Sequence, residues 1–308
     1  MVLYNLISAV FHGLGDSRTP LITVCIACVC NIVGDYIFVA ILKLGALGAA
    51  VATVTAQLLS VLCSVLIIRK KTLPFEFHLS DIKLNKKIAL RELRLGVPVG
   101  LQELLAGISF IFIQTIVNSF DVVSSAGVGV AEKVCAFLML SSSAFSQATS
   151  AFVAQNMGAN QVKRANDALK CGIAASLSIG IVLALVTFFF GDLLAGIFAR
   201  DSEVIQKAYL YLKAYAIDTI LISVTVCFVG YYNGCGKTAF VMVQGIIGAV
   251  FVRIPVVYVI STLPGVTLFH IGLAYPSAAF VQLLLHLGFM LYLKAKRKKA
   301  APSAVSAK

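Results

Sequence analysis

The chain has 308 residues, of which 60% are hydrophobic and 12% charged, with no tryptophan and a formal net charge of +12. Soluble domains are about 45 to 50% apolar, so this composition excludes an ordinary soluble protein and indicates a membrane protein. The basic residues gather in alternate loops between apolar stretches, which is the pattern of membrane topology and excludes nucleic acid as the expected partner.

Apolar stretches of about 20 residues, long enough to cross a hydrocarbon core of about 30 Å, recur along the chain. Each is expected to be helical, because an unpaired strand edge cannot face lipid. Eight full spans are predicted, at residues 19–42, 45–68, 96–120, 126–153, 171–197, 208–232, 239–260 and 271–293. Residues 1–11 are apolar but too short to cross and lack the basic leader of a secretory signal, so they are interpreted as the end of a ninth helix.

Loop charges give an expected orientation in the cell membrane. Most of the lysines and arginines lie before the first full span, between the second and third, between the fourth and fifth, between the sixth and seventh, and in the tail after residue 293. Basic loops stay on the inner side of the membrane, so these loops and the carboxyl terminus are predicted to be cytoplasmic.

A polar turn occurs twice between apolar stretches. The stretch GLGDS begins at Gly13 and GCGKT begins at Gly234, which is an offset of 221 residues. Glycine permits the backbone to leave one helix and enter the next, so Gly13, Gly15, Gly234 and Gly236 are predicted as structural hinges. Matching landmarks follow each turn in the same order, namely a glycine, a glutamine and a basic exit: Gly48 and Gly272, Gln57 and Gln282, and the endings IIRKK and LKAKRKK.

Such internal repeats are characteristic of transporters in which two similar helical bundles alternate access to a central site. Both turns lie on the predicted cytoplasmic side, so the repeats should be parallel. Symmetry then implies roughly 128 further residues before the first residue, and an intact protein with two six-helix lobes. The predicted fold class is an all-α polytopic membrane protein with two pseudo-symmetric lobes, the first incomplete. The expected domains are an amino-terminal lobe at 1–68, a linker at 69–95, a carboxyl-terminal lobe at 96–293 and a basic tail at 294–308.

The stretch GCGKT is similar to the end of a phosphate-binding loop. That motif requires a glycine at position 231, which is Tyr231, and a preceding strand, which is not predicted. ATP is therefore not an expected partner, and an ion gradient is the expected energy source.

Several segments resemble the multidrug and toxic compound extrusion (MATE) family: GLGDSRTPL with NIVGDYIF, GALGAAVATVTAQ, GVPVGLQELL and AFVAQNMGANQVKRA. The resemblance covers nearly the whole chain apart from the family's first three helices and most of the fourth. It implies twelve helices in two lobes and secondary active efflux of organic, often cationic compounds, driven by inward sodium or proton flow. No enzymatic activity, catalytic residue or cofactor is expected.

Asn31 and Asp35 are four residues apart, hence on one helix face, and Thr53 on the next, antiparallel helix is expected at the same depth. A carboxylate, an amide oxygen and a hydroxyl can form a site for a hard cation or a proton. The resemblance implies the same role, because the matching residues of the family belong to its amino-terminal ion site. A purely structural role for Asp35 is the alternative.

Four residues of the second lobe are candidates for a substrate cavity: Gln102, Glu103, Tyr215 and Asp218. Charged groups inside a membrane cost on the order of 3 kcal/mol, so each needs a reason to be there. Bundle-internal hydrogen bonds or an interfacial position are the alternatives for Glu103 and Asp218. The adjacent residues Glu132 and Lys133 diverge by about 100° on a helix, so each is expected to have a partner elsewhere. Arg253 is interpreted as structural, with neutralisation of a carboxylate across the bundle as the alternative.

The eight cysteines do not predict a metal centre, since Cys25, Cys28 and Cys30 lie inside an apolar helix and no second cluster completes a zinc site. No metal is expected beyond sodium at the coupling site, and no role is assigned to the histidines. Residues 80–96 combine leucine and isoleucine on one helix side with basic residues, which predicts an interfacial helix or, equally, a solvated linker.

The expected function is thus export of organic cations in exchange for sodium ions or protons, with the lipid bilayer and small organic substrates as partners and a monomer as the expected state. A lipid-linked sugar flippase of the wider superfamily is the nearest alternative. A remnant without transport activity is the other alternative, because the first lobe is expected to be incomplete.

Overall fold

The computed structural model describes residues 2–70 and 85–300, and every regular element in these ranges is a helix. Each of the eight predicted spans corresponds to a helix long and apolar enough to cross a membrane, and most of these helices extend beyond the predicted bounds. The fold class predicted from the sequence is therefore confirmed. The described residues fall into two units, which are considered separately: unit 1 before residue 86 and unit 2 from residue 86 onward, a division inside the predicted linker.

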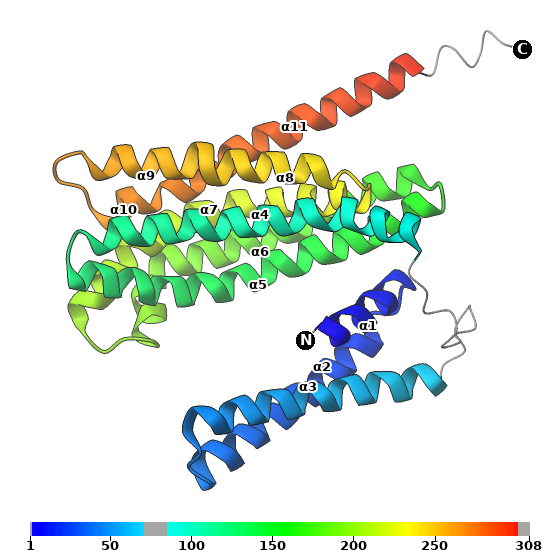
Figure 1. The fold of residues 1–308 in the computed structure, drawn as a ribbon. Helices are drawn as coiled ribbons and strands as arrows, with labels where there is room; N and C mark the ends of the chain where they lie inside the picture. Colours follow the sequence, from blue (N-terminus) through cyan, green and yellow to red (C-terminus); the bar gives the residue numbers. More distant parts are fainter. Residues whose placement is uncertain (1, 71–84, 301–308) are drawn as a thin grey trace, which may run out of the picture. The chain divides into compact units, whose positions relative to one another are not determined.

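Unit 1 contains one short helix and a long antiparallel hairpin (Figure 1). Its elements are α1 (Val2–Gly13), α2 (Arg18–Asp35), the π-helix η1 (Tyr36–Ile41) and α3 (Gly45–Lys70). The elements α2 and η1 form one continuous span, and α3 returns along it.

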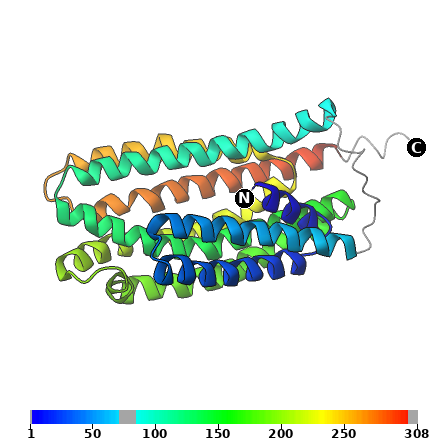
Figure 2. The ribbon, with the colours of Figure 1, turned by 60° about the horizontal axis from the view of Figure 1, so that its bottom comes forward.

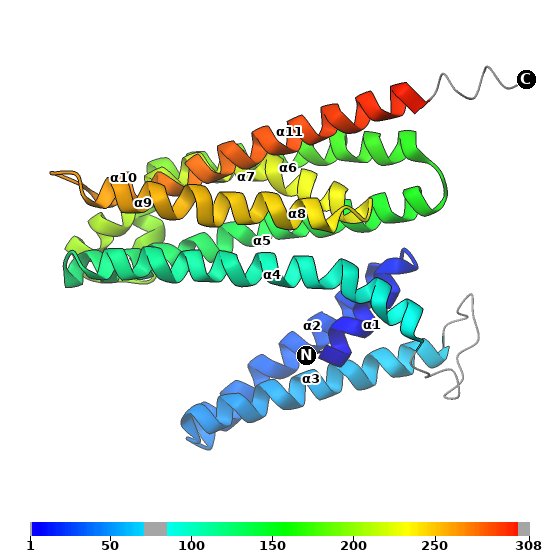
Figure 3. The ribbon, with the colours of Figure 1, turned by 45° about the horizontal axis from the view of Figure 1, so that its top comes forward.

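Unit 2 is a bundle of long helices that run nearly side by side, which two further views confirm (Figures 2 and 3). Its elements are α4 (Lys86–Asn118), α5 (Val122–Gly158), α6 (Val162–Gly196), α7 (Ser202–Gly234), α8 (Thr238–Ile246), the π-helix η3 (Ile247–Arg253), α9 (Ile254–Ser261), α10 (Leu268–Gly272) and α11 (Ala274–Ala300). The helix α7 has the largest buried share of the spans and packs against α5, α6, α10 and α11.

The span from α8 to α9 changes its winding in the middle. Pro255 lies just after η3 and lacks the N–H that would bond four residues back, at Phe251. A proline in a helix causes local rewinding of this kind, and π-turns of this kind frequently occur at functional sites. The rewound segment ends at Arg253, which is one of the charged residues of the site described below.

The two predicted hinges have the same hydrogen bonds. In unit 1 the amides of residues 14, 15 and 16 bond to the carbonyls of residues 10, 12 and 11, at 3.0, 3.1 and 2.9 Å. In unit 2 the amides of residues 235, 236 and 237 bond to the carbonyls of residues 231, 233 and 232, at 3.0, 2.9 and 2.8 Å. Each bond lies 221 residues from its counterpart. Gly15 and Gly236 both have positive φ, at 83° and 69°, a conformation that glycine adopts at little cost.

The interfacial helix predicted at 80–96 lies partly outside the described residues. From Lys86 onward the segment is helical, but it continues without interruption into the membrane span and belongs to α4. At 1.5 Å per residue the 33 residues of α4 extend about 50 Å, which exceeds the bilayer core of about 30 Å. Its first turns therefore project toward the headgroup layer as a continuation of the span.

Candidate functional site

The candidate cavity residues of α7 lie at the centre of unit 2. Tyr215 and Asp218 are 6% and 2% exposed and lie three residues apart, hence on one face of the helix. Tyr211, one turn earlier on the same face, is also buried. This buried face of α7 contributes three of the side chains of the candidate site.

Three other elements complete the site around α7: α5 contributes Glu132, η3 contributes Arg253 and α11 contributes Tyr275. The Arg253 guanidinium lies 4.5 Å from the centroid of the Tyr275 ring. That ring in turn meets the rings of Tyr211 and Tyr215, at centroid distances of 6.2 and 5.8 Å. These six residues, Glu132, Tyr211, Tyr215, Asp218, Arg253 and Tyr275, are called the unit 2 cluster from here on.

The charges of the unit 2 cluster do not balance. Arg253 interacts electrostatically with Asp218, whereas the Oε1 atom of Glu132 is buried and accepts no hydrogen bond. Burying an ionised carboxylate costs several kcal/mol unless a cation or hydrogen-bond donors compensate it. The cluster thus contains two carboxyl groups and one guanidinium, which interacts with Asp218, so it can accept one further positive charge, as a proton, an inorganic cation or an organic cation.

The neighbouring candidates of α4 are not brought together with each other. Gln102 packs against α8, where a Cβ built on Gly245 would lie 2.6 Å from its Cγ, and its Oε1 atom is buried without a hydrogen bond. Glu103 is exposed. Adjacent helical residues diverge by about 100°, so one of the two can face the bundle while the other faces away.

The predicted ion site of unit 1 is partly assembled. The Nδ2 atom of Asn31 donates to the Oγ1 atom of Thr53 at 3.5 Å, while Thr53 donates to the carbonyl of Ala49 at 2.9 Å. This bond uses the Asn31 amide nitrogen, and its side-chain oxygen is an acceptor suited to a donor or a cation. Asp35, one turn further along the span, has a buried Oδ1 atom without a hydrogen bond.

An open pocket of about 350 Å³ lies beside Asn31 and Thr53, entirely within unit 1. Its other polar side chains are amides and a hydroxyl, from Asn5, Gln57 and Ser60. Asp35 does not line this pocket, so its carboxylate and the pocket do not form a single ion site in this structure. Amide, hydroxyl and carboxylate oxygens are ligands suited to hard cations.

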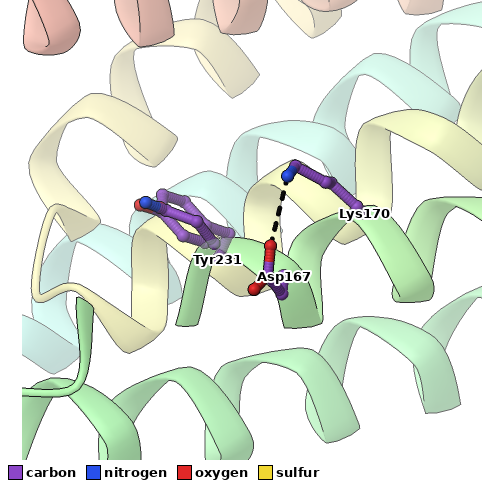
Figure 4. A network of polar contacts seen from close by, with 4 residues as sticks. Asp167, Lys170 and Tyr231 are labelled. Carbon is purple, nitrogen blue, oxygen red and sulfur yellow. Dashed lines mark hydrogen bonds and ion pairs between the residues drawn. The ribbon is translucent and has the colours of Figure 1, made fainter. Parts of the chain in front are cut away.

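The second hinge is fastened to the adjacent helix by a polar contact. The hydroxyl of Tyr231 donates to Oδ1 of Asn166 at 2.6 Å. The next residue, Asp167, pairs with Lys170, one turn later on α6, at 3.1 Å (Figure 4). Tyr231 belongs to α7, so GCGKT joins two helices and does not follow a strand. The geometry is that of a helix-to-helix turn.

Sequence reasoning did not assign site roles to four members of the unit 2 cluster: Glu132, Tyr211, Arg253 and Tyr275. Glu132 and Arg253 stood out as charged groups inside spans, but their partners lie on other helices. The spacing of Tyr211, Tyr215 and Asp218 at i, i+4 and i+7 was an available signal for one shared face. Lys133 diverges from Glu132 as expected, lying 5.9 Å from the centroid of the Phe198 ring.

Comparisons with known proteins agree with this architecture. The MatE family model matches residues 98–259, which is more than half of the chain, and the model named Lipid II flippase MurJ matches residues 1–120. The probable multidrug resistance protein YoeA of Bacillus subtilis is 27% identical over 97% of this chain. The chain spans 66% of the length of that relative, just under two thirds.

Solved structures show the same fold. A crystal structure of a MATE protein in complex with MaL6 matches 96% of this chain and 67% of its own, with a TM-score of 0.87 at 19% identity. The MATE transporter ClbM in complex with Rb⁺ matches 92% of this chain and 63% of its own, with a TM-score of 0.80 at 22% identity. Since the family match covers most of unit 2 and the helices follow the fold of solved MATE transporters, this multi-pass membrane chain belongs to the MATE family of multidrug efflux transporters.

Proposed function

We propose that the protein exports organic cations by secondary active antiport, in exchange for sodium ions or protons, with its carboxyl terminus in the cytoplasm. The observation that carries the proposal is the charge imbalance of the unit 2 cluster: Arg253 interacts with Asp218, while the buried Oε1 atom of Glu132 has no hydrogen-bond partner. A membrane interior with one uncompensated acid favours a cationic occupant.

The proposal gives the two units different tasks. Asn31, Asp35 and Thr53 of unit 1 hold the coupling ion or proton, supported by the Asn31–Thr53 contact and the unpaired Asp35 oxygen. The unit 2 cluster holds the organic cation, and its tyrosine rings supply faces that attract positive charge. Each elementary charge moving down 100 mV supplies about 2.3 kcal/mol, enough to concentrate a substrate substantially. The Rb⁺ ion named for ClbM supports a monovalent cation as one ligand of this fold.

The flippase alternative has one supporting observation, the match of residues 1–120 to the MurJ model. A phosphate-bearing lipid head group would require a cavity with an excess of positive charge. In the part of unit 2 that the structure describes, Lys133 and Lys213 lie over aromatic rings, and the cluster itself holds more acids than bases. The charge of the cluster therefore favours export of cations.

Dye efflux from vesicles with imposed sodium or proton gradients tests the proposal. Asp218→Asn and Glu132→Gln are each expected to reduce efflux of a cationic dye at least tenfold. Asp35→Asn is expected to abolish gradient-driven efflux. The matched control is Glu103→Gln, which removes an exposed carboxylate from a span and should leave efflux within twofold. Unchanged efflux in Asp218→Asn and Glu132→Gln would overturn the assignment of the cluster, and efflux without any gradient would overturn antiport.

A further inference from the structure

A second pocket lies at the end of unit 2 that we predict to be cytoplasmic. It has a volume of about 500 Å³ and is lined by Lys87, Leu90, Arg91, Arg94 and Leu95 of α4 and by Gly236 of the α7–α8 turn. Both elements lie at the same end of the bundle (Figures 1 and 3). Its last lining residue on α4, Leu95, lies two helical turns before Gln102, and the pocket shares no residue with the unit 2 cluster.

The residues of α4 that line the pocket form one helix face. Lys87, Arg91 and Arg94 are spaced at i, i+4 and i+7, so their charges point the same way. Glu92, the acid of this turn, is not part of the lining. In the part of the chain that the structure describes, Arg91 and Arg94 make no ion pair and no hydrogen bond, so both guanidinium groups remain available to an anion.

The opposite wall adds backbone groups that suit an anion. Gly236 has positive φ, and a Cβ built on it would find no atom within 4 Å, so the turn leaves open space in front of the helix that follows. That helix, α8, begins at Thr238 without a side-chain cap. Unpaired amides and the positive end of the helix dipole favour negative charge at such a helix start.

The surroundings of the pocket indicate which kind of anion it takes. Its wall also includes two leucines: Leu90, which is 62% exposed, and Leu95. Because the first turns of α4 project from the membrane span, these leucines lie where glycerol and the upper acyl chains of a lipid would be. A soluble phosphate would use the arginines but gain nothing from the leucines.

We propose that this pocket binds the phosphate-bearing headgroup of an anionic phospholipid of the cytoplasmic leaflet. The planar guanidinium groups of Arg91 and Arg94 hold the phosphate oxygens, and the start of α8 faces the same charge. The lipid would thereby link α4 to the α7–α8 turn, one of the two hinges of the fold. This binding is separate from transport and can be present or absent whatever the exported substrate.

The test measures binding of fluorescent phosphatidylglycerol to the purified chain in detergent, with phosphatidylcholine as the neutral comparison. Each basic group near an anionic surface contributes a factor of about five, so Arg91→Gln with Arg94→Gln is expected to weaken binding about thirtyfold. Arg91→Lys with Arg94→Lys keeps the charge but loses the planar fork, and should weaken binding only about threefold.

The matched control is Lys163→Gln with Lys294→Gln, which removes two exposed charges from the same predicted side of the membrane. Binding within twofold of the unmodified chain is expected for this control. An equal loss in both double variants would show a diffuse positive surface and overturn the site, as would retained binding in the arginine-to-glutamine variant. Equal binding of phosphatidylcholine would overturn the anionic headgroup, and displacement by millimolar inorganic phosphate would assign the pocket to free phosphate instead of lipid.

Discussion

The two helix-turn-helix hinges have the same backbone and very different surroundings. A Cβ built on Gly13 finds no atom within 4 Å, whereas one built on Gly234 lies 2.6 Å from the carbonyl oxygen of Ser150 and 2.8 Å from Cβ of Val153. The turn itself is held by bonds between residues a few positions apart, so it forms in both places. Packing around it depends on distant helices, and here α5 covers the second hinge closely.

The spans after the hinges differ in the same way. Val24 of α2 corresponds to Gly245 of α8 at the offset of 221 residues. In unit 2 this position is covered by Gln102 from α4, while in unit 1 Val24 lines the open pocket and no described helix of that unit takes the place of α4. The comparison shows that the repeat preserves local geometry, whereas the packing around equivalent positions differs between the two units.

The largest expected difference between the hinges comes from adding one methyl group to each. Gly234→Ala should lower the free energy of unfolding by about 1 to 3 kcal/mol, because the methyl group has no space against α5. Gly13→Ala should leave stability within about 0.5 kcal/mol. Thermal unfolding in detergent, followed by circular dichroism, measures both. Equal losses at the two positions would break the comparison.

The turns themselves should respond alike. Gly15→Ala and Gly236→Ala each place a side chain at positive φ in open space, so the cost is conformational, about 1 kcal/mol at each turn. Hydrogen exchange of the turn amides reports this local opening separately in each unit. Gly107→Ala, inside a helix with open space, is the control and should show no loss. Faster exchange at only one turn would contradict their equivalence.

An aromatic cluster behind the second hinge contains an unusual histidine. His286 is fully buried between Phe228 and Tyr232, at ring centroid distances of 5.6 and 5.5 Å, and neither ring nitrogen has a hydrogen-bond partner. His286→Phe keeps the ring packing and removes two unpaired polar atoms, so stability should rise by up to about 1 kcal/mol.

The same substitution at His270 is the matched control. Nδ1 of His270 accepts the backbone N–H of Thr267 at 3.1 Å and so caps the start of α10. His270→Phe removes this acceptor and should therefore lower stability, whereas His286→Phe should raise it. Unfolding temperatures in detergent measure both changes. A loss in both variants would show that His286 is stabilised by a contact other than ring packing.

The smallest expected effect concerns a helix cap and its pH dependence. Oδ1 of Asp121 accepts the backbone N–H of Ser124 at 2.6 Å at the start of α5, and this bond and that from the Ser124 hydroxyl hold the pKa of Asp121 below its usual value of 3.8. Because the folded-state pKa is lowered, the ionised carboxylate stabilises the protein at pH values above the unfolded-state pKa of about 4. This stabilisation is lost as the pH falls through the folded-state pKa.

Asp121→Asn keeps an oxygen acceptor but removes the charge. The variant should therefore be slightly less stable than the unmodified chain at pH 6, and the difference should vanish at low pH. Unfolding temperatures between pH 3 and pH 6 test this. The comparison in unit 1 is Asp16, two residues before α2, whose Oδ1 atom accepts the backbone N–H groups of Arg18 and Thr19, both at 3.1 Å. A difference independent of pH would show that the charge contributes nothing.

The sequence by itself determined the membrane spans, the two hinges and the family resemblance. Spans follow from apolar length, because a helix must satisfy its backbone inside lipid whatever lies beside it. Hinges follow from glycine, because Gly15 and Gly236 adopt a backbone conformation that most residues avoid. Both signals are local, and each needs only neighbouring residues in the chain.

Only the tertiary structure decided which polar groups inside the membrane meet. The sequence offered Glu103 and Asp218 equally as cavity residues, yet Asp218 is buried with Arg253 nearby while Glu103 is exposed. Helical spacing fixes which residues share a face, but the rotation of each helix and the choice of its neighbours depend on how whole side-chain surfaces pack. Glu132 and Tyr275 therefore entered the site only when α5, α7 and α11 were placed together.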